Sequence, residues 1–116
     1  MNVEWIKCEG DKWCGLNTVN LDHSHFDDLE GVYIIWHGGS NAATVRVGQG
    51  VIRDRLAAHR EDDDIQAYAH LTLFATWASV AKQYRDGVEA YLADSLNPKV
   101  GERFPDRVPI EVNLPW

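Results

Sequence analysis

The sequence has no apolar run that approaches the roughly 20 residues needed for a membrane-spanning helix. Its first residues also lack the basic region and apolar stretch that together mark a secretory signal. The first absence argues against a membrane-embedded protein, and the second argues against a secreted one. We expect a soluble, cytoplasmic protein with no membrane partner.

Repeats, low-complexity tracts and linker-like segments are also missing from the 116 residues. A chain of this length supports one hydrophobic core and leaves little room for a second. The apolar fraction of 45%, with five tryptophans, four tyrosines and three phenylalanines, favours a folded globule over disorder. We therefore expect a single domain over residues 1–116.

Positive charge is scarce, because 18 acidic residues outnumber 11 basic ones and leave a net charge of −7. Nucleic-acid binders usually carry a basic face, since neutralising phosphates supplies most of their non-specific affinity. The exception is residues 46–60, which contain one aspartate and four arginines: Arg46, Arg53, Arg55 and Arg60. This distribution predicts either a small, local contact with nucleic acid or a partner of another kind.

The two cysteines of the chain, Cys8 and Cys14, lie near two histidines, His23 and His25. Together they offer the ligand types of a zinc site. However, the Cys-x5-Cys spacing is wider than usual and the His-x-His spacing is narrower. We therefore expect no zinc, two reduced thiols near strand residues, and two loop histidines.

The middle of the chain predicts a β-hairpin that leads directly into a short helix. Residues 31–36 and 44–50 are rich in β-forming types and flank a His-Gly-Gly-Ser-Asn segment that favours chain reversal. Ile52, Leu56 and His59 then recur at helical spacing. This unit gathers a tyrosine, two arginines and a histidine in one small region, which is unusual for a purely structural core.

Further elements are predicted on both sides of this unit. Residues 3–7 predict a short strand, and residues 13–21 predict an irregular extended segment in an N-terminal arm that covers one sheet edge. Residues 70–77 alternate in part and predict a third strand. Residues 79–96 predict the best helix of the chain, with its serine as N-cap, and residues 110–114 predict a final strand.

The motifs of the hairpin and the helix resemble those of the GIY-YIG nuclease family. Gly31-Val32-Tyr33 is similar to the first motif, and Arg46-Val47-Gly48 stands in place of the second, with arginine where the family usually has tyrosine. Arg55 and His59 match the arginine and histidine of the helix that follows, including their four-residue spacing.

The resemblance extends to the later helix, where Glu89 matches the single metal-binding glutamate of the family. Pro98-Lys99-Val100-Gly101 stands where the family often ends in Pro-x-x-Asn, so glycine replaces the asparagine. The family-like core covers residues 30–101, with an N-terminal extension at 1–29 and a C-terminal tail at 102–116. The resemblance implies an α/β (α+β) fold with a small, mainly antiparallel sheet flanked by helices, here with an N-terminal strand extension.

The resemblance also implies a chemistry, namely endonucleolytic hydrolysis of DNA phosphodiester bonds with Mg²⁺ or Mn²⁺ as cofactor. Tyr33 would activate water with help from His59, since an isolated phenol with a pKa near ~10 is a poor base at neutral pH. Arg55 would neutralise the phosphate, and Glu89 would be the catalytic metal ligand. We expect these groups and Arg46 to converge on one groove, presented by the hairpin and both helices to the same side of the sheet.

Arg46, Arg53 and Arg60 are the expected nucleic-acid-binding residues, and a targeting protein partner is a further expectation. The alternative is a catalytically inactive GIY-YIG-like module that binds nucleic acid or a protein. The net charge of −7, Arg46 and Gly101 favour that alternative.

Each candidate residue also has a plainer interpretation. Tyr33 suits a core position with its hydroxyl at the rim, and Arg55 and His59 suit a solvated helix face. Glu89 suits an ordinary surface pair with Arg85, one helical turn earlier.

Overall fold

The computed structural model describes residues 1–101 and 105–116 of the chain. Its strands are β1 (Cys14–Gly15), β2 (Glu30–His37), β3 (Ala43–Val51) and β4 (Leu73–Ser79). Its α-helices are α1 (Ile52–Arg60), α2 (Asp63–Gln66) and α3 (Lys82–Leu96). Short 3₁₀ turns lie at Glu9–Asp11, Ser24–Phe26 and Ala69–Leu71.

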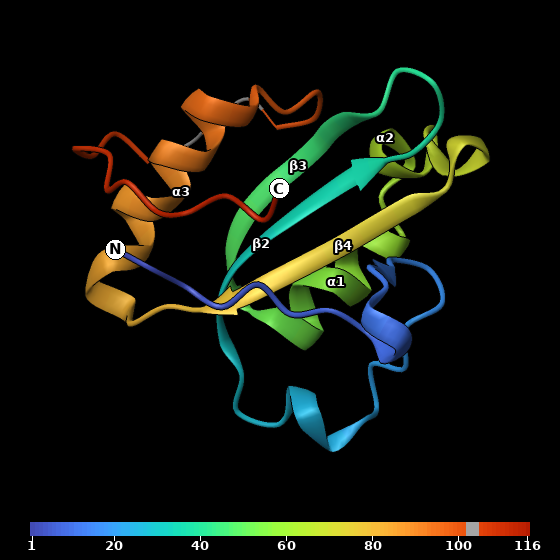
Figure 1. Ribbon diagram of the computed structural model, residues 1–116, viewed down its shortest axis with the longest axis horizontal. Coiled ribbons are helices and arrows are strands. Elements are labelled where there is room, and N and C mark those ends of the chain that lie inside the picture. The colour runs from blue at the N-terminus through green and yellow to red at the C-terminus, as the bar shows by residue number, and fades with distance from the viewer. Residues whose placement is uncertain (102–104) are drawn as a thin grey trace.

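The strands form one antiparallel sheet in the order β1-β4-β2-β3 (Figure 1). β2 and β3 are the predicted hairpin, and their register places Tyr33 opposite Gly48. A register shift between Ile35 and Trp36 bends the hairpin beyond that point. The predicted α+β class, with a small antiparallel sheet and flanking helices, is confirmed.

The sheet carries a hydrophobic core on each face, because successive strand residues point to opposite sides. On one face Tyr33 and Ile35 pack with Leu56 of α1. On the other face Val32 and Ile34 pack with residues of α3. The two long helices therefore cover opposite faces of the sheet, and β2 is buried between them.

The N-terminal arm covers the β4 edge of the sheet, as predicted, through the two-residue strand β1. The predicted strand over residues 3–7 is wrong, because this segment makes only isolated contacts with β4. Among them, the Ile6 N–H donates to the Trp77 carbonyl at 3.0 Å. Trp5 and Trp13 are half-buried, so the arm hides much of its aromatic surface.

The cysteines do not remain reduced, contrary to the sequence expectation. Cys8 and Cys14 form a disulfide, with Cα atoms 5.1 Å apart. A tight turn brings them together, because Cys8 pairs with Lys12 across the 3₁₀ segment between them. Both sulfurs are thereby used in a covalent bond and are not thiolate ligands for zinc.

Two predicted boundaries shift along the chain. The third strand begins at Leu73 because Thr72 adopts a positive φ of 67° after a 3₁₀ turn. The last helix begins at Lys82, since Ser79 still pairs with Gly31 in the sheet and is not the N-cap. The helix ends at Leu96, as predicted.

The predicted final strand over residues 110–114 is also wrong. Of the predicted C-terminal tail, residues 102–104 lie outside the described residues. The rest crosses α3, where the Ile110 N–H donates to the Gly87 carbonyl at 2.9 Å. It then meets the N-terminal arm, where the Asn113 side chain accepts from Val3 and donates to it. The two ends of the chain therefore lie side by side (Figure 1). Among the described residues, no helix is long and apolar enough to cross a membrane.

Candidate functional site

A buried phenol–imidazole pair lies on the α1 face of the sheet. The Tyr33 side chain is 1% exposed, and its oxygen is 2.5 Å from Nε2 of His59. His59 faces the sheet because it lies two helical turns after Ile52, on the buried side of α1. The cross-strand partner of Tyr33 is Gly48, and a Cβ there would collide with the phenol ring. Glycine at this position therefore lets the tyrosine lie across β3.

His59 is held in its neutral form. Burial, together with the smaller effects of the positive charges of Arg55 and Arg46, lowers the pKa of His59 to about 4. Asp62 raises this pKa, but the effect is smaller. At neutral pH the imidazole thus has one nitrogen free to accept a proton.

Two arginines bring positive charge to this pair from β3 and α1. Arg55 lies over Gly50, where an added Cβ would touch its Cγ and Cδ atoms at 3.4 Å. Gly50 also has a φ of 130°, a conformation that favours glycine at the junction of β3 and α1. The Nε atom of Arg46 is buried and has no hydrogen-bond partner within the described part of the chain.

Neither Arg46 nor Arg55 is used in an ion pair with the rest of the described chain, where salt bridges within 4.0 Å involve other residues. A buried guanidinium nitrogen without an acceptor is costly. The two side chains are thus available for an anion.

Glu89 presents a carboxyl group from α3 and is 8% exposed. Burial raises the pKa of Glu89, and the negative charge of Asp86 adds to this effect. A hydrogen bond from Gln49 and the charges of Arg46 and Arg55 act in the opposite direction. The plainer interpretation of a surface pair with Arg85 is wrong, because Arg85 is buried and pairs with Glu30 at 3.3 Å.

The prediction that the hairpin and both helices present these groups to the same side of the sheet is wrong. The helices carrying Arg55 and Glu89 lie on opposite faces of the sheet, and not on the same side. Both helices contact β3, which is the edge strand of the sheet, and the charge of Arg55 acts on Glu89 from there. Gln49 of β3 links to α3 there, since its amide donates to the Asp86 carboxylate at 2.7 Å.

The charges of Arg46 and Arg55 consequently act on His59 and on Glu89 alike. The structure thus pairs Tyr33 directly with His59 and places Arg46 and Arg55 where their charges act on both His59 and Glu89.

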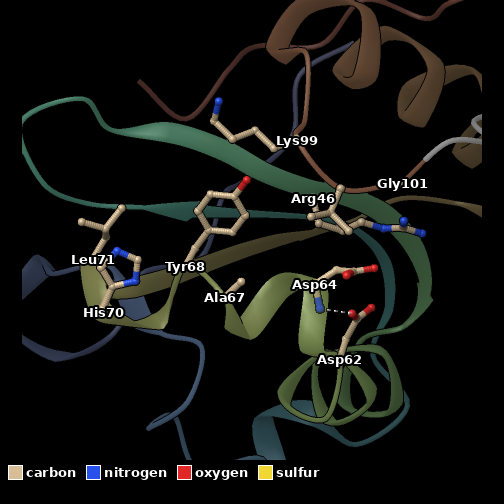
Figure 2. Close-up of a pocket in the computed structure, with 10 residues that line it drawn as sticks. Arg46, Asp62, Asp64, Ala67, Tyr68, His70, Leu71, Lys99 and Gly101 are labelled. Atoms are coloured by element: carbon tan, nitrogen blue, oxygen red, sulfur yellow. Dashed lines mark hydrogen bonds between the residues drawn. The ribbon is translucent and has the colours of Figure 1, made fainter.

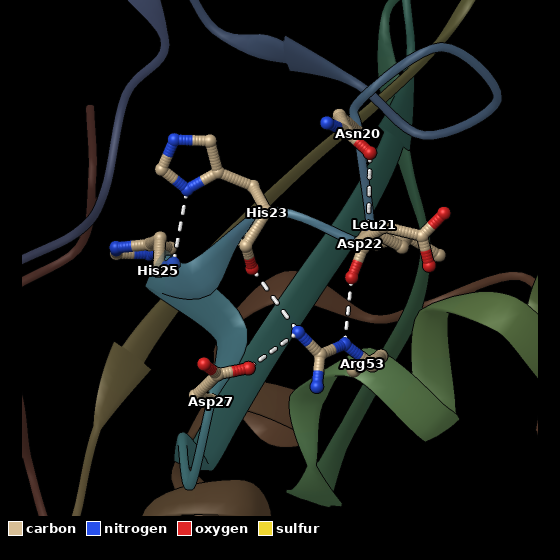
Figure 3. A network of polar contacts seen from close by, with 7 residues as sticks. All are labelled: Asn20, Leu21, Asp22, His23, His25, Asp27 and Arg53. Carbon is tan, nitrogen blue, oxygen red and sulfur yellow. Dashed lines mark hydrogen bonds and ion pairs between the residues drawn. The ribbon is translucent and has the colours of Figure 1, made fainter.

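Arg53 is not brought to this site. Its guanidinium holds the loop before β2 (Figure 3), where Nε donates to the Leu21 carbonyl at 2.6 Å. Nη2 donates to the His23 carbonyl at 3.1 Å and pairs with Asp27 at 2.9 Å. Two of its three nitrogens, Nε and Nη2, therefore donate within the protein.

Arg60 also serves the N-terminal arm. Its Nε donates to the Leu16 carbonyl at 2.7 Å, and its Nη2 donates to the Val19 carbonyl at 2.5 Å. Arg60 and Arg53 thus fasten the arm to α1, and their expected contact with nucleic acid stays a prediction.

A pocket of about 940 Å³ adjoins the site (Figure 2). Arg46 and Lys99 lie on its β3 side, while Asp62 and Asp64 lie at the start of α2. Lys99 is brought there because the segment after α3 runs along β3, where its N–H donates to the Thr44 carbonyl at 3.2 Å. Tyr68 also lines the pocket and lies below Lys99 in this view.

Sequence reasoning missed several residues of this region: Gln49, Asp62, Asp64, Tyr68, Asp86 and Lys99. Only Lys99 carried a signal, because it lies in the Pro-Lys-Val-Gly segment. The others depend on how α2 and α3 approach β3, which no local pattern reveals.

Two carboxylates of α3 are the candidate metal ligands of this region. Within the described residues, no group of three or more histidine, cysteine, aspartate or glutamate side chains forms a metal cage. Glu89 and Asp86 are one turn apart on α3 and offer the hard oxygen ligands that Mg²⁺ prefers, with water in the other positions. The buried, destabilised carboxyl of Glu89 is a group that an adjacent cation would stabilise.

No protein-family model, no curated protein and no solved structure matches this chain.

Proposed function

We propose that this protein is a metal-dependent endonuclease that hydrolyses DNA phosphodiester bonds with a GIY-YIG-type site. The observation that carries the proposal is the 2.5 Å contact between Tyr33 and His59, next to two arginines with no ion-pair partner among the described residues. Hydrolysis needs a base for water, positive charge for the phosphate and stabilisation of the leaving oxygen. The region offers a candidate for each role.

Tyr33 and His59 together form the general base in this mechanism. In the tautomer that carries its proton on Nδ1, His59 accepts the Tyr33 O–H at Nε2. As a water molecule attacks phosphorus, its proton passes to the phenolic oxygen and the phenolic proton passes to His59. The histidine ends as an imidazolium, and the P–O bond to the leaving oxygen breaks.

The arginines make this proton transfer dependent on substrate. Their positive charges contribute to the low pKa of His59 in the free protein. A phosphate bound between Arg46 and Arg55 would neutralise that charge and raise the pKa of His59. His59 would therefore become a stronger base when the phosphodiester to be cut is bound.

Glu89, with Asp86 beside it, would hold Mg²⁺ or Mn²⁺ in this proposal. The ion, when bound, supplies positive charge that stabilises the leaving oxygen. Gln49 positions these carboxylates by tying β3 to α3. The net charge of −7 disfavours long contacts with DNA, so a partner protein would target the domain to its substrate.

The test is nicking of supercoiled plasmid in Mg²⁺ or Mn²⁺, compared with the same reaction in a chelator. Glu89→Gln should reduce cutting by at least roughly 100-fold, because it removes a charged metal ligand. Glu4→Gln is the matched control, since it removes the same charge from an exposed position and should leave cutting unchanged. Equal cutting by both variants would exclude Glu89 as the metal ligand.

A catalytically inactive module is the second candidate, favoured by Arg46 in place of the family tyrosine, by Gly101 in place of the asparagine and by the net charge of −7. Such a module would bind DNA, seen as gel retardation, or would bind a protein partner. It would not nick plasmid with either metal. Failure to cut and to retard DNA at low salt, where electrostatic binding is strongest, would exclude both nucleic-acid roles.

A further inference from the structure

We infer that the pocket beside the site holds one unpaired nucleotide of the substrate strand. The residues that line the pocket include Arg46, Asp62, Asp64, Tyr68 and Lys99. The inference rests on the proposed function and specifies its substrate class, which is single-stranded DNA or a nucleotide turned out of a duplex.

The size and charge of the pocket suit a nucleotide. Its volume of about 940 Å³ lies near the upper end of the range of roughly 300–1,000 Å³ found for small-molecule pockets. Arg46 and Lys99 on the β3 side match a phosphate. Asp62 and Asp64 on the opposite side offer acceptors for the amino and ring N–H groups of a base.

The carboxylates of Asp62 and Asp64 favour an unpaired base over a base in a duplex. In a duplex, the Watson–Crick donors of each base are already bonded to the opposite strand, and the phosphates face outward. A continuous duplex would bring further phosphates toward Asp62 and Asp64, where like charges repel. An unpaired base presents free donors to these carboxylates and avoids that repulsion.

Tyr68 provides an aromatic surface for such a base. Its ring stacks on His37 with centroids 5.4 Å apart and planes 1° from parallel, so the ring is held in one orientation. It remains half-buried and lines the pocket below Lys99. Rigid aromatic rings that alternate with cations are the usual means of holding single-stranded nucleic acid.

The pocket and the phenol–imidazole pair share a face of the sheet. Tyr33 and His37 are four residues apart on β2 and point to the same side, which separates them by about 13 Å. Arg46 lines the pocket and also acts on His59, and its buried Nε has no acceptor among the described residues. A strand whose phosphate lies at Arg46 therefore directs its neighbouring base toward Tyr68.

The test compares binding of two fluorescein-labelled DNA probes by anisotropy in chelator: a 20-nucleotide single strand and a hairpin duplex of the same sequence. Wild type should bind the single strand more tightly than it binds the hairpin duplex. Tyr68→Ala should weaken single-strand binding by roughly tenfold and change duplex binding by less than about twofold. Tyr84→Ala is the matched control, because Tyr84 is an exposed tyrosine on α3, and it should change neither.

Two further variants distinguish the loss of a contact from misfolding. A thermal melt shows whether each variant is folded. Tyr68→Phe keeps the ring and should bind as wild type does. Asp64→Asn changes an exposed side chain of the pocket and should reduce the preference for the single strand. Equal binding of both probes by wild type, or equal losses for both in Tyr68→Ala, would overturn the inference.

Cutting is measured on the same probes with Mg²⁺, and it separates this inference from the proposed function. A preference for single strands that depends on Tyr68, without any cutting, would reject the nuclease and keep the pocket as a nucleotide site. Equal cutting of both probes by wild type and Tyr68→Ala would keep the nuclease and reject the pocket.

Discussion

The four arginines between residues 46 and 60 fall into two pairs with opposite roles. Arg53 and Arg60 donate to backbone carbonyls of the N-terminal arm at 2.5–3.1 Å. Arg46 and Arg55 act electrostatically on His59 and Glu89, and the Nε of Arg46 has no acceptor among the described residues. Arginines that donate to acceptors within the protein stabilise the fold. Arginines that lie beside a cleft and lack such acceptors are the better candidates for binding an anion.

The largest expected effect is on the cutting rate. It is tested by replacing one arginine of each pair with alanine. Arg55→Ala should reduce cutting by at least roughly 100-fold, because it removes charge from the proposed phosphate site, and should weaken DNA binding as well. Arg53→Ala should leave cutting almost unchanged and lower the free energy of unfolding by about 1–3 kcal/mol, since it leaves carbonyls and Asp27 without their donor. Plasmid nicking and urea unfolding of both variants measure the two effects.

A smaller effect concerns the low pKa of His59, which burial and, to a lesser extent, the charges of Arg55 and Arg46 produce. The pKa of His59 is about 4 in the folded protein and about 6.5 when unfolded. Between these values the unfolded chain binds more protons, so the free energy of unfolding falls as pH decreases. The contribution of His59 to this loss should be about 2 kcal/mol at pH 5.

The pH effect is measured by urea unfolding at pH 7 and pH 5. His59→Gln should unfold with a weaker pH dependence than wild type, because glutamine does not titrate. The groups that face His59 are Tyr33, Arg46, Arg55 and Asp62. An identical loss in wild type and His59→Gln would assign the pH dependence to other groups.

The smallest expected effect tests whether Arg60 acts through geometry or through charge. Arg60→Lys keeps the positive charge but replaces a rigid fork that reaches two carbonyls. The free energy of unfolding should fall by about 1 kcal/mol, and DNA binding should not change. A loss of DNA binding in this variant would move Arg60 from the structural pair to the functional one.

Local patterns were sufficient to predict the hairpin and α1. Strand alternation and the turn residues between 37 and 41 determine the pairing of β2 with β3, and helical spacing places His59 on the buried side. The selection of Tyr33, Arg55 and Glu89 came from the resemblance, because each residue alone has an ordinary structural interpretation.

The remaining features depend on contacts between distant segments. The disulfide needs the turn that returns Cys14 to Cys8, and the late start of α3 follows from the pairing of Ser79 with Gly31. The roles of Arg53 and Arg60 depend on an arm whose course the sequence did not specify. For the same reason the pocket at Tyr68 was missed, since it forms only where α2 and the segment after α3 approach β3.

The most direct test of the proposed site is the cutting rate of Tyr33→Phe on bound DNA under single-turnover conditions. The variant deletes one oxygen and retains the ring that lies across Gly48, so DNA binding should remain within about twofold of wild type. We expect Tyr33→Phe to cut roughly 100-fold or more slowly than wild type, because the proton path from water to His59 is broken. A Tyr33→Phe protein that cuts as fast as wild type would contradict the account.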